Sequence, residues 1–87
     1  MKKIEYNNNK NIIFRQLKAA RKKAGISQKE LAAKMQILNI NIDQQMISKI
    51  ENNRRIVTDY ELACFCKIFS VDEKELLKDY YNAITEM

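Results

Sequence analysis

The chain has 87 residues, a length that suits one domain and leaves no room for a second. It contains one glycine, no proline and no histidine. Small strand-rich domains usually need glycine and proline for their tight turns, so this composition favours an all-α fold. Histidine is the most common general base, and the sequence also lacks a glycine-rich phosphate loop and a nucleophile-elbow motif. We therefore expect neither enzymatic activity nor a cofactor.

The net charge of +5 is unevenly distributed along the chain. Residues 1–55 hold 13 lysines and arginines against four acidic residues, whereas residues 56–87 hold three against seven. This asymmetry predicts that the first part of the chain faces a polyanion. On composition alone, the alternative to polyanion binding is a basic surface that is only solvated by water.

No apolar run approaches the roughly 18 residues that a membrane helix needs, and the polar start of the chain is unlike a signal peptide. We therefore expect a cytoplasmic protein with no membrane partner. Cys64 and Cys66 would point about 200° apart on a helix and so share no face. Two cysteines also cannot complete a four-ligand zinc site. We interpret both as core residues, with a zinc or redox role as the alternative, and predict no metal site.

Residues 1–10 show no helical period and contain three consecutive asparagines, so we predict a flexible N-terminal arm there. The first helix is predicted over residues 12–23, where apolar side chains recur at spacings of three and four residues. Asn11 is its predicted N-cap. Gly25 is the predicted stop, because glycine readily adopts the left-handed conformation that ends many helices.

Ser27 and Glu30 form a capping-box pattern that predicts the start of the second helix. Asn39, which tolerates a positive φ better than most residues, is the predicted end of that helix. Asp43 is then the predicted N-cap of a third helix over residues 44–52.

A second capping box, Thr58 with Glu61, predicts a fourth helix that runs to about Phe69. A box-like start at Asp72 predicts a fifth helix. Its apolar stripe comprises Leu76, Leu77, Tyr80, Tyr81 and Ile84. Five helices leave no length for a sheet, so the predicted fold class is all-α.

Residues 17–32 read LKAARKKAGISQKELA, and residues 47–55 read ISKIENNRR. Together these segments resemble the Xre/Cro-type helix-turn-helix of lambdoid phage repressors, Cro proteins and many bacterial regulators. The resemblance covers residues 11–78. It implies a five-helix, lambda-repressor-like domain in which the second and third helices form the helix-turn-helix. We assign residues 11–80 to this DNA-binding domain and residues 81–87 to a C-terminal helix extension.

The third helix has an apolar face and a polar face. Ile47 and Ile50 are three residues apart and share the buried side. The opposite side suits base edges, since glutamine pairs with adenine through two hydrogen bonds and lysine reaches guanine. We predict that DNA bases are read by Gln44, Gln45, Ser48 and Lys49. The resemblance implies base contacts for all of these except Ser48, and an ordinary solvated face is the alternative. Met46 either packs below this face, which we favour, or touches a thymine methyl group.

Side chains flanking the third helix are predicted to contact DNA phosphates, which set register without reading sequence. These are Gln28, Lys29, Asn52, Asn53, Arg54 and Arg55. Gln28 matches a family position that hydrogen-bonds a phosphate, and the N-terminus of its helix favours anions. The alternatives are helix propensity for Gln28 and mere solvation for Arg54 and Arg55. The resemblance further implies a structural ion pair between Arg21 and Glu51.

Two features depart from the family pattern. The turn between the second and third helices usually has about four residues with a glycine, whereas here residues 36–42 separate Met35 from Asp43. We expect an extra turn on the second helix and then a crossing held by Ile37, Leu38, Ile40 and Ile42, as in a longer-turn subgroup. The angle between the two helices is therefore not predicted. Asn53 stands where the family commonly has glycine, and asparagine can also adopt a positive φ.

These features predict a sequence-specific regulator of transcription that binds double-stranded DNA. We expect a dimeric repressor that reads the major groove with the third helix. Part of the C-terminal stripe closes the core, while Tyr81 and Ile84 form either a frayed end or a homodimer surface. The alternative function is an antitoxin-type interaction module that binds a toxin as well as its own operator.

Overall fold

The computed structural model describes residues 6–85 and contains six helices within them. They are α1 (Phe14–Ala24), α2 (Gln28–Ile37), α3 (Gln44–Glu51), α4 (Asp59–Phe69), α5 (Glu73–Leu76) and α6 (Lys78–Thr85). Residues 6–85 form no strand, and the prediction of an all-α fold is confirmed. Residues 1–5 of the predicted arm and residues 86–87 of the predicted extension lie outside the described part of the chain.

The predicted capping boxes form and define where α2 and α4 begin. Ser27 Oγ accepts the Glu30 N–H at 3.0 Å, and the Glu30 carboxylate accepts the Ser27 N–H at 3.0 Å. Thr58 and Glu61 repeat this exchange at 3.3 and 3.0 Å. Each box satisfies two N–H groups that have no partner within the helix. The local sequence therefore predicted both helix starts correctly.

The start of α1 differs from the prediction by two residues. The helix begins at Phe14, and Ile13 is its N-cap residue. Asn11 Oδ1 accepts the Ile13 N–H at 3.0 Å, while Asn11 Nδ2 donates to the carbonyl oxygens of Ile50 and Arg55 at 2.9 and 3.0 Å. These distant partners fix Asn11 outside the helix, so it links α1 to the end of α3.

The long connection between α2 and α3 packs through its second half. α2 continues for two residues past Met35, to Ile37, which is less than the full extra turn that was expected, and Asn39 follows with a φ of 63°. Ile42 is fully buried, and Ile40 packs partly against the core. Ile37 is 79% exposed, so it takes no part in holding the crossing, contrary to expectation.

The core lies where α1, α2, α3, α4 and α5 meet. Its buried apolar side chains are Ile13, Leu17, Leu31, Ala32, Met35, Ile42, Ile47, Ile50, Phe65, Cys66 and Leu76. Burial raises the pKa of the Cys66 thiol, and the half-buried Cys64 packs against the same core. The core interpretation of both cysteines is confirmed.

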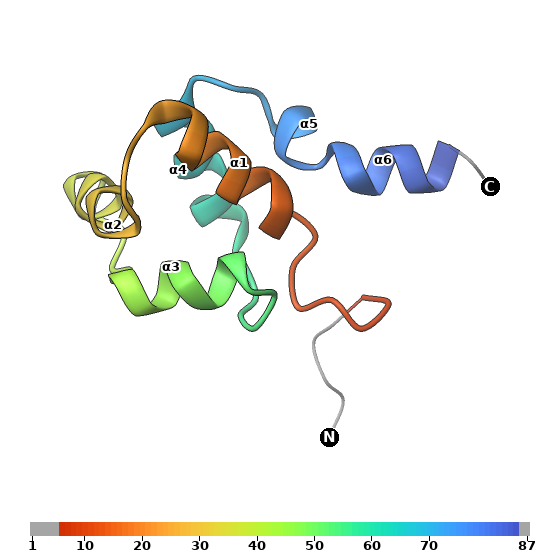
Figure 1. Ribbon diagram of the computed structural model, residues 1–87, viewed down its shortest axis with the longest axis horizontal. Helices are drawn as coiled ribbons and strands as arrows, with labels where there is room; N and C mark the ends of the chain where they lie inside the picture. Colours follow the sequence, from red (N-terminus) through yellow and green to blue (C-terminus); the bar gives the residue numbers. More distant parts are fainter. Residues whose placement is uncertain (1–5, 86–87) are drawn as a thin grey trace.

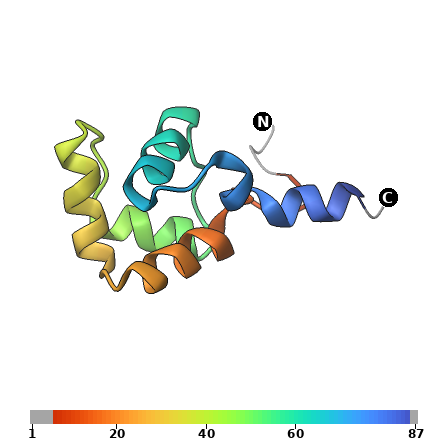
Figure 2. The ribbon, with the colours of Figure 1, turned by 90° about the horizontal axis from the view of Figure 1, so that it is seen from above.

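The predicted single fifth helix is divided at Leu77, and its second half leaves the body of the domain. Asp72 caps α5 by accepting the Glu75 N–H at 3.0 Å. The Glu75 carboxylate instead accepts from Lys78 Nζ at 3.1 Å, so the predicted box does not close. α6 projects away from the other helices in both Figure 1 and Figure 2. Among residues 6–85, no helix is both long and apolar enough to span a membrane.

Candidate nucleic-acid interface

One side of α3 is anchored in the core and the other faces solvent. Ile47 and Ile50 are fully buried. Three predicted base-reading side chains, Gln44, Gln45 and Lys49, are exposed, and the fourth, Ser48, is half-buried. Met46 packs against the core, as we favoured. The Asp43 carboxylate accepts the Met46 N–H at 2.8 Å and so caps the N-terminus of this helix.

An ion pair fixes the C-terminal end of α3 to α1. Arg21 Nε lies 2.7 Å from Glu51 Oε2, and Arg21 Nη2 donates to Glu51 Oε1 at 3.0 Å. The side chains of Arg21 and Glu51 are only 12% and 1% exposed, so this pair is shielded from water. Hydrogen bonding to Glu51 raises the pKa of Arg21. Arg21 Nη1 also donates to the Ile26 carbonyl at 2.9 Å, which ties the turn before α2 to the same pair.

Gln28, the first residue of α2, joins this ion pair. Its Nε2 donates to Glu51 Oε1 at 3.1 Å, which leaves the second N–H of the amide for another acceptor. The neighbouring Lys29 is exposed at the same helix N-terminus. Glu51 therefore orients the amide that was predicted to bind a phosphate.

The backbone turns sharply after α3. Asn52 Nδ2 donates back to the Ser48 carbonyl at 2.9 Å and approaches its hydroxyl at 3.4 Å. Asn53 has a φ of 60°, as its place in the family pattern predicted. The Arg54 N–H then bonds to the Lys49 carbonyl at 2.7 Å. Arg54 is exposed, and no ion pair involves it within residues 6–85.

The Asn53 side chain points to the N-terminal segment of the chain. Its Oδ1 accepts the N–H groups of Lys10 and Asn11 at 2.9 and 3.4 Å. Its Nδ2 donates to Asn9 Oδ1 at 2.7 Å. This amide was predicted to bind DNA phosphates, but both of its polar atoms have partners within the protein.

Residues 6–10, part of the predicted flexible arm, are folded. Tyr6 and Asn9 exchange two backbone hydrogen bonds of 2.7 Å each, and the residues between them, Asn7 and Asn8, have φ values of 48° and 66°. Two consecutive positive φ values are typical of the tightest hairpin turns, which favour asparagine. The three consecutive asparagines therefore favour a tight turn, which was not predicted for this segment.

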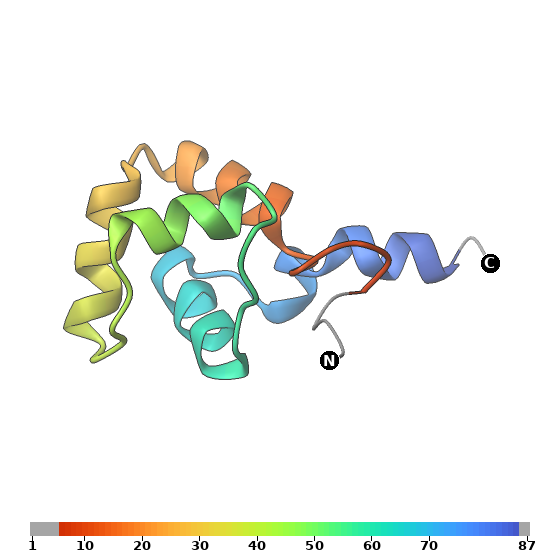
Figure 3. The ribbon, with the colours of Figure 1, turned by 90° about the horizontal axis from the view of Figure 1, so that it is seen from below.

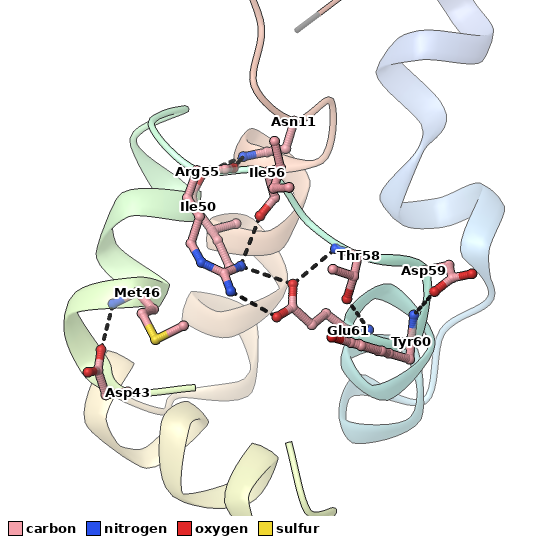
Figure 4. A network of polar contacts seen from close by, with 10 residues as sticks. All are labelled: Asn11, Asp43, Met46, Ile50, Arg55, Ile56, Thr58, Asp59, Tyr60 and Glu61. Atoms are coloured by element: carbon pink, nitrogen blue, oxygen red, sulfur yellow. Dashed lines mark hydrogen bonds and ion pairs between the residues drawn. The ribbon is translucent and has the colours of Figure 1, made fainter. Parts of the chain in front are cut away.

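Arg55 forms an ion pair with a residue of α4. Its Nη1 and Nη2 donate to the two carboxylate oxygens of Glu61 at 2.9 and 3.0 Å, and Nη1 also reaches the Ile56 carbonyl at 2.9 Å. Figure 4 shows how this carboxylate also accepts the N–H of Thr58. The guanidinium that was predicted to bind DNA thus links the loop after α3 to the capping box of α4.

The environment of Glu61 stabilises its charged form. Burial by itself raises the pKa of this carboxyl, but the hydrogen bonds from Arg55 and Thr58 outweigh burial and bring the pKa below its usual value. The hydrogen bonds that Arg55 itself donates to Glu61 raise the pKa of Arg55. No local pattern indicated this pair, because the capping box alone accounts for a glutamate at position 61.

A family model described as helix-turn-helix matches residues 17–76. The matched stretch begins within α1, ends with α5 and includes all of α2 and α3. No curated protein matches the chain.

Proposed function

We propose that this chain, which belongs to the Xre/lambda-repressor-like family of DNA-binding helix-turn-helix proteins, is a sequence-specific regulator of transcription. In this proposal the protein is a homodimeric repressor that places α3 in the major groove of double-stranded DNA. The supporting observation is the two-sided environment of α3. Its apolar side is buried, its C-terminal end is fixed through Glu51, and its polar side is exposed.

The exposed side of α3 has the chemistry for reading bases. Gln44 and Gln45 each carry an amide that can pair with adenine through two hydrogen bonds, and Lys49 can donate to guanine. Ser48 lies beside them, but it is half-buried and its carbonyl accepts from Asn52. We assign direct reading to the two glutamines and the lysine, and a supporting contact to Ser48.

The six residues predicted to contact phosphates divide into three that are free to bind DNA and three that are bonded within the protein. Gln28 keeps a free amide hydrogen at the N-terminus of α2, where the helix dipole favours an anion, and Lys29 and Arg54 are exposed. We propose that these three bind phosphates. Asn52 caps α3, and Asn53 and Arg55 are bonded within the protein, so their contribution is to shape the loop.

A salt titration tests DNA binding. Fluorescence anisotropy with a labelled random-sequence duplex measures the affinity from low to high salt. If several cations neutralise phosphates, log K falls linearly with log[salt], with a slope of about −0.9 for each phosphate bound. A slope near zero would contradict the proposal. Selection of bound duplexes from a random pool then tests for sequence specificity.

The homodimer part of the proposal rests on α6. This helix projects from the body of the domain and exposes Tyr81 and Ile84, which are 42% and 38% accessible. One recognition helix covers only a few base pairs, and two-fold dimers commonly reach half-sites about 34–36 Å apart. The break at Leu77 lies close to the proposed domain limit at residue 80. Residues 81–85 would then serve the contact between subunits.

Sedimentation of a charge variant tests this assignment. Ile84→Lys is expected to convert a dimer to a monomer, because it places a charge in an apolar contact. Ile37→Lys, at an isoleucine that is 79% exposed, is the matched control and is expected to stay dimeric. A wild-type monomer at micromolar concentration, or a dimer unaffected by Ile84→Lys, would contradict the homodimer.

The exposed apolar side of α6 would also suit an antitoxin that binds a toxin. The discriminating measurement is purification of the untagged chain from its native cell. A stoichiometric partner protein that is lost with Ile84→Lys would favour the antitoxin function, whereas a clean homodimer would count against it.

A further inference from the structure

Asn53 has the positive φ that glycine adopts readily, and both polar atoms of its side chain are hydrogen-bonded. Glycine would also adopt the positive φ of this turn, but it has no side-chain amide to form these contacts. The Asn53 amide makes hydrogen bonds of 2.9, 3.4 and 2.7 Å to Lys10, Asn11 and Asn9. All three partners lie more than 40 residues away along the chain. The asparagine side chain therefore gives the N-terminal segment an attachment point at the end of α3.

The attached segment is itself fixed at two further points. Asn11 donates to the carbonyl oxygens of Ile50 and Arg55, on either side of the turn. At the other end of the segment, the ring of Tyr6 packs edge-on against Tyr80, with centroids 5.6 Å apart. The backbone of Lys10 lies between these contacts, so its position relative to α3 is defined.

The segment lies on the same edge of the molecule as α3. In Figure 1, α3, the loop that follows it and residues 6–10 lie along the lower edge. Seen from below in Figure 3, the three follow one another across the face. Lys10 is exposed, and Asn53, which accepts its N–H, directly precedes the exposed Arg54.

This arrangement adds a cation beside the proposed DNA-binding surface. No ion pair within residues 6–85 involves Lys10, Lys49 or Arg54. Asp59 lines the same groove as Lys10, but the two described residues form no ion pair with each other. The charge of Lys10 is therefore available to an external anion.

We propose that Asn53 is a positioning residue that docks residues 9–11 at the end of α3, so that Lys10 binds a DNA phosphate next to Arg54. The inference rests on the proposed function and extends its surface to a segment outside the helix-turn-helix. Phosphate is the ligand, because an exposed lysine beside an arginine offers charge and no base-reading geometry. The attachment keeps Lys10 in place before DNA arrives, which lowers the entropic cost of the contact.

The first test is the salt dependence of Lys10→Ala on a random-sequence duplex. Loss of one phosphate contact is expected to reduce the magnitude of the slope of log K against log[salt] by about 0.9. Lys74→Ala is the matched control, since Lys74 is exposed on α5 at the opposite edge in Figure 1, and its slope is expected to equal that of the wild type. An unchanged slope for Lys10→Ala would overturn the inference.

The second test is Asn53→Gly, which allows the positive φ and removes only the side-chain amide. It is expected to lower the slope as Lys10→Ala does, and adding Lys10→Ala is expected to have little further effect. Amide hydrogen exchange at Lys10 and Asn11 in the free protein is expected to become faster. If Lys10→Ala has its full effect in the Asn53→Gly background, the attachment does not position Lys10. Should Asn53→Gly fail to fold, the Lys10→Ala slope decides alone.

Failure of this inference is distinguishable from failure of the proposed function. If the wild-type slope is near zero, the chain does not bind DNA through phosphates, and both fall. If the wild-type slope is steep and Arg54→Ala reduces it while Lys10→Ala does not, only the inference about the N-terminal segment falls.

Discussion

The helices α3 and α6 have the same length of eight residues and both are amphipathic, but they differ in how deeply their side chains are buried. α3 packs against α1 and α2, and Ile47, Ile50 and Glu51 are buried. α6 packs mainly against α5, and no side chain in residues 78–84 is buried. An amphipathic pattern therefore does not by itself say what covers the apolar side.

The side that faces solvent is polar in α3, whereas in α6 the apolar side is accessible as well. α3 uses its apolar side within the chain, so its polar side is left for a ligand. α6 leaves Ile84 accessible, so its apolar side is left for another protein surface. The comparison explains why we assign DNA to one helix and a second copy to the other.

The largest expected effect is on the buried side of α3. Ile47→Ala is expected to lower the free energy of unfolding by about 3–4 kcal/mol, because it leaves a cavity at a fully buried site. Ile84→Ala on α6 is expected to cost less than about 1 kcal/mol at low protein concentration, where no dimer forms. Urea unfolding measures both. Equal losses would show that the two helices do not differ as described.

The next effect concerns the end of α3. Arg21→Ala is expected to destabilise the fold by about 3 kcal/mol, since it leaves the Glu51 carboxylate buried without its charged partner. Lys22→Ala, at the exposed neighbouring residue, is the control and is expected to lie within about 0.5 kcal/mol of the wild type. A similar small loss for Arg21→Ala would mean that the ion pair does not hold α3.

The exposed side of α3 is tested by binding and not by stability. Gln44→Ala and Gln45→Ala are each expected to cost about 1–3 kcal/mol of binding to the selected DNA site and to relax specificity at one base position. Arg54→Ala is expected to weaken all duplexes alike. Competition with the selected site and with a random duplex measures both. Unchanged specificity in the glutamine variants would place the reading face elsewhere.

The smallest expected effect is the pH dependence of the link between α3 and α4. Because the folded state lowers the pKa of Glu61, its contribution is fully present above the ordinary glutamate pKa and is lost as the pH falls through the lower folded value. Glu61→Gln is expected to cost about 1 kcal/mol near neutral pH and nothing below that window. Urea midpoints over the acid range measure the difference. Glu73→Gln, at an exposed carboxylate, is the control. A difference that is independent of pH would contradict the ionic role of Glu61.

Much of the fold was predictable from interactions between residues that are close together in the sequence. Ser27 with Glu30 and Thr58 with Glu61 predicted helix starts, because a capping box needs only residues three positions apart. Asn53 was expected to take a positive φ because the resemblance placed it where the family commonly has glycine, and asparagine tolerates that conformation. The apolar spacing likewise placed Ile47 and Ile50 on the buried side of α3.

The sequence by itself thus determined the all-α class, most helix boundaries and the polar side of α3. Only the tertiary structure decided which partners the flanking polar groups take. Arg55 pairs with Glu61, Asn53 bonds to residues 9–11, and Asn11 joins two carbonyl groups instead of capping α1. The last two sets of contacts join residues that are about 40 positions apart in the chain. Such donors and acceptors meet only after the helices have packed, so a pattern of residues that are close in sequence cannot predict these hydrogen bonds.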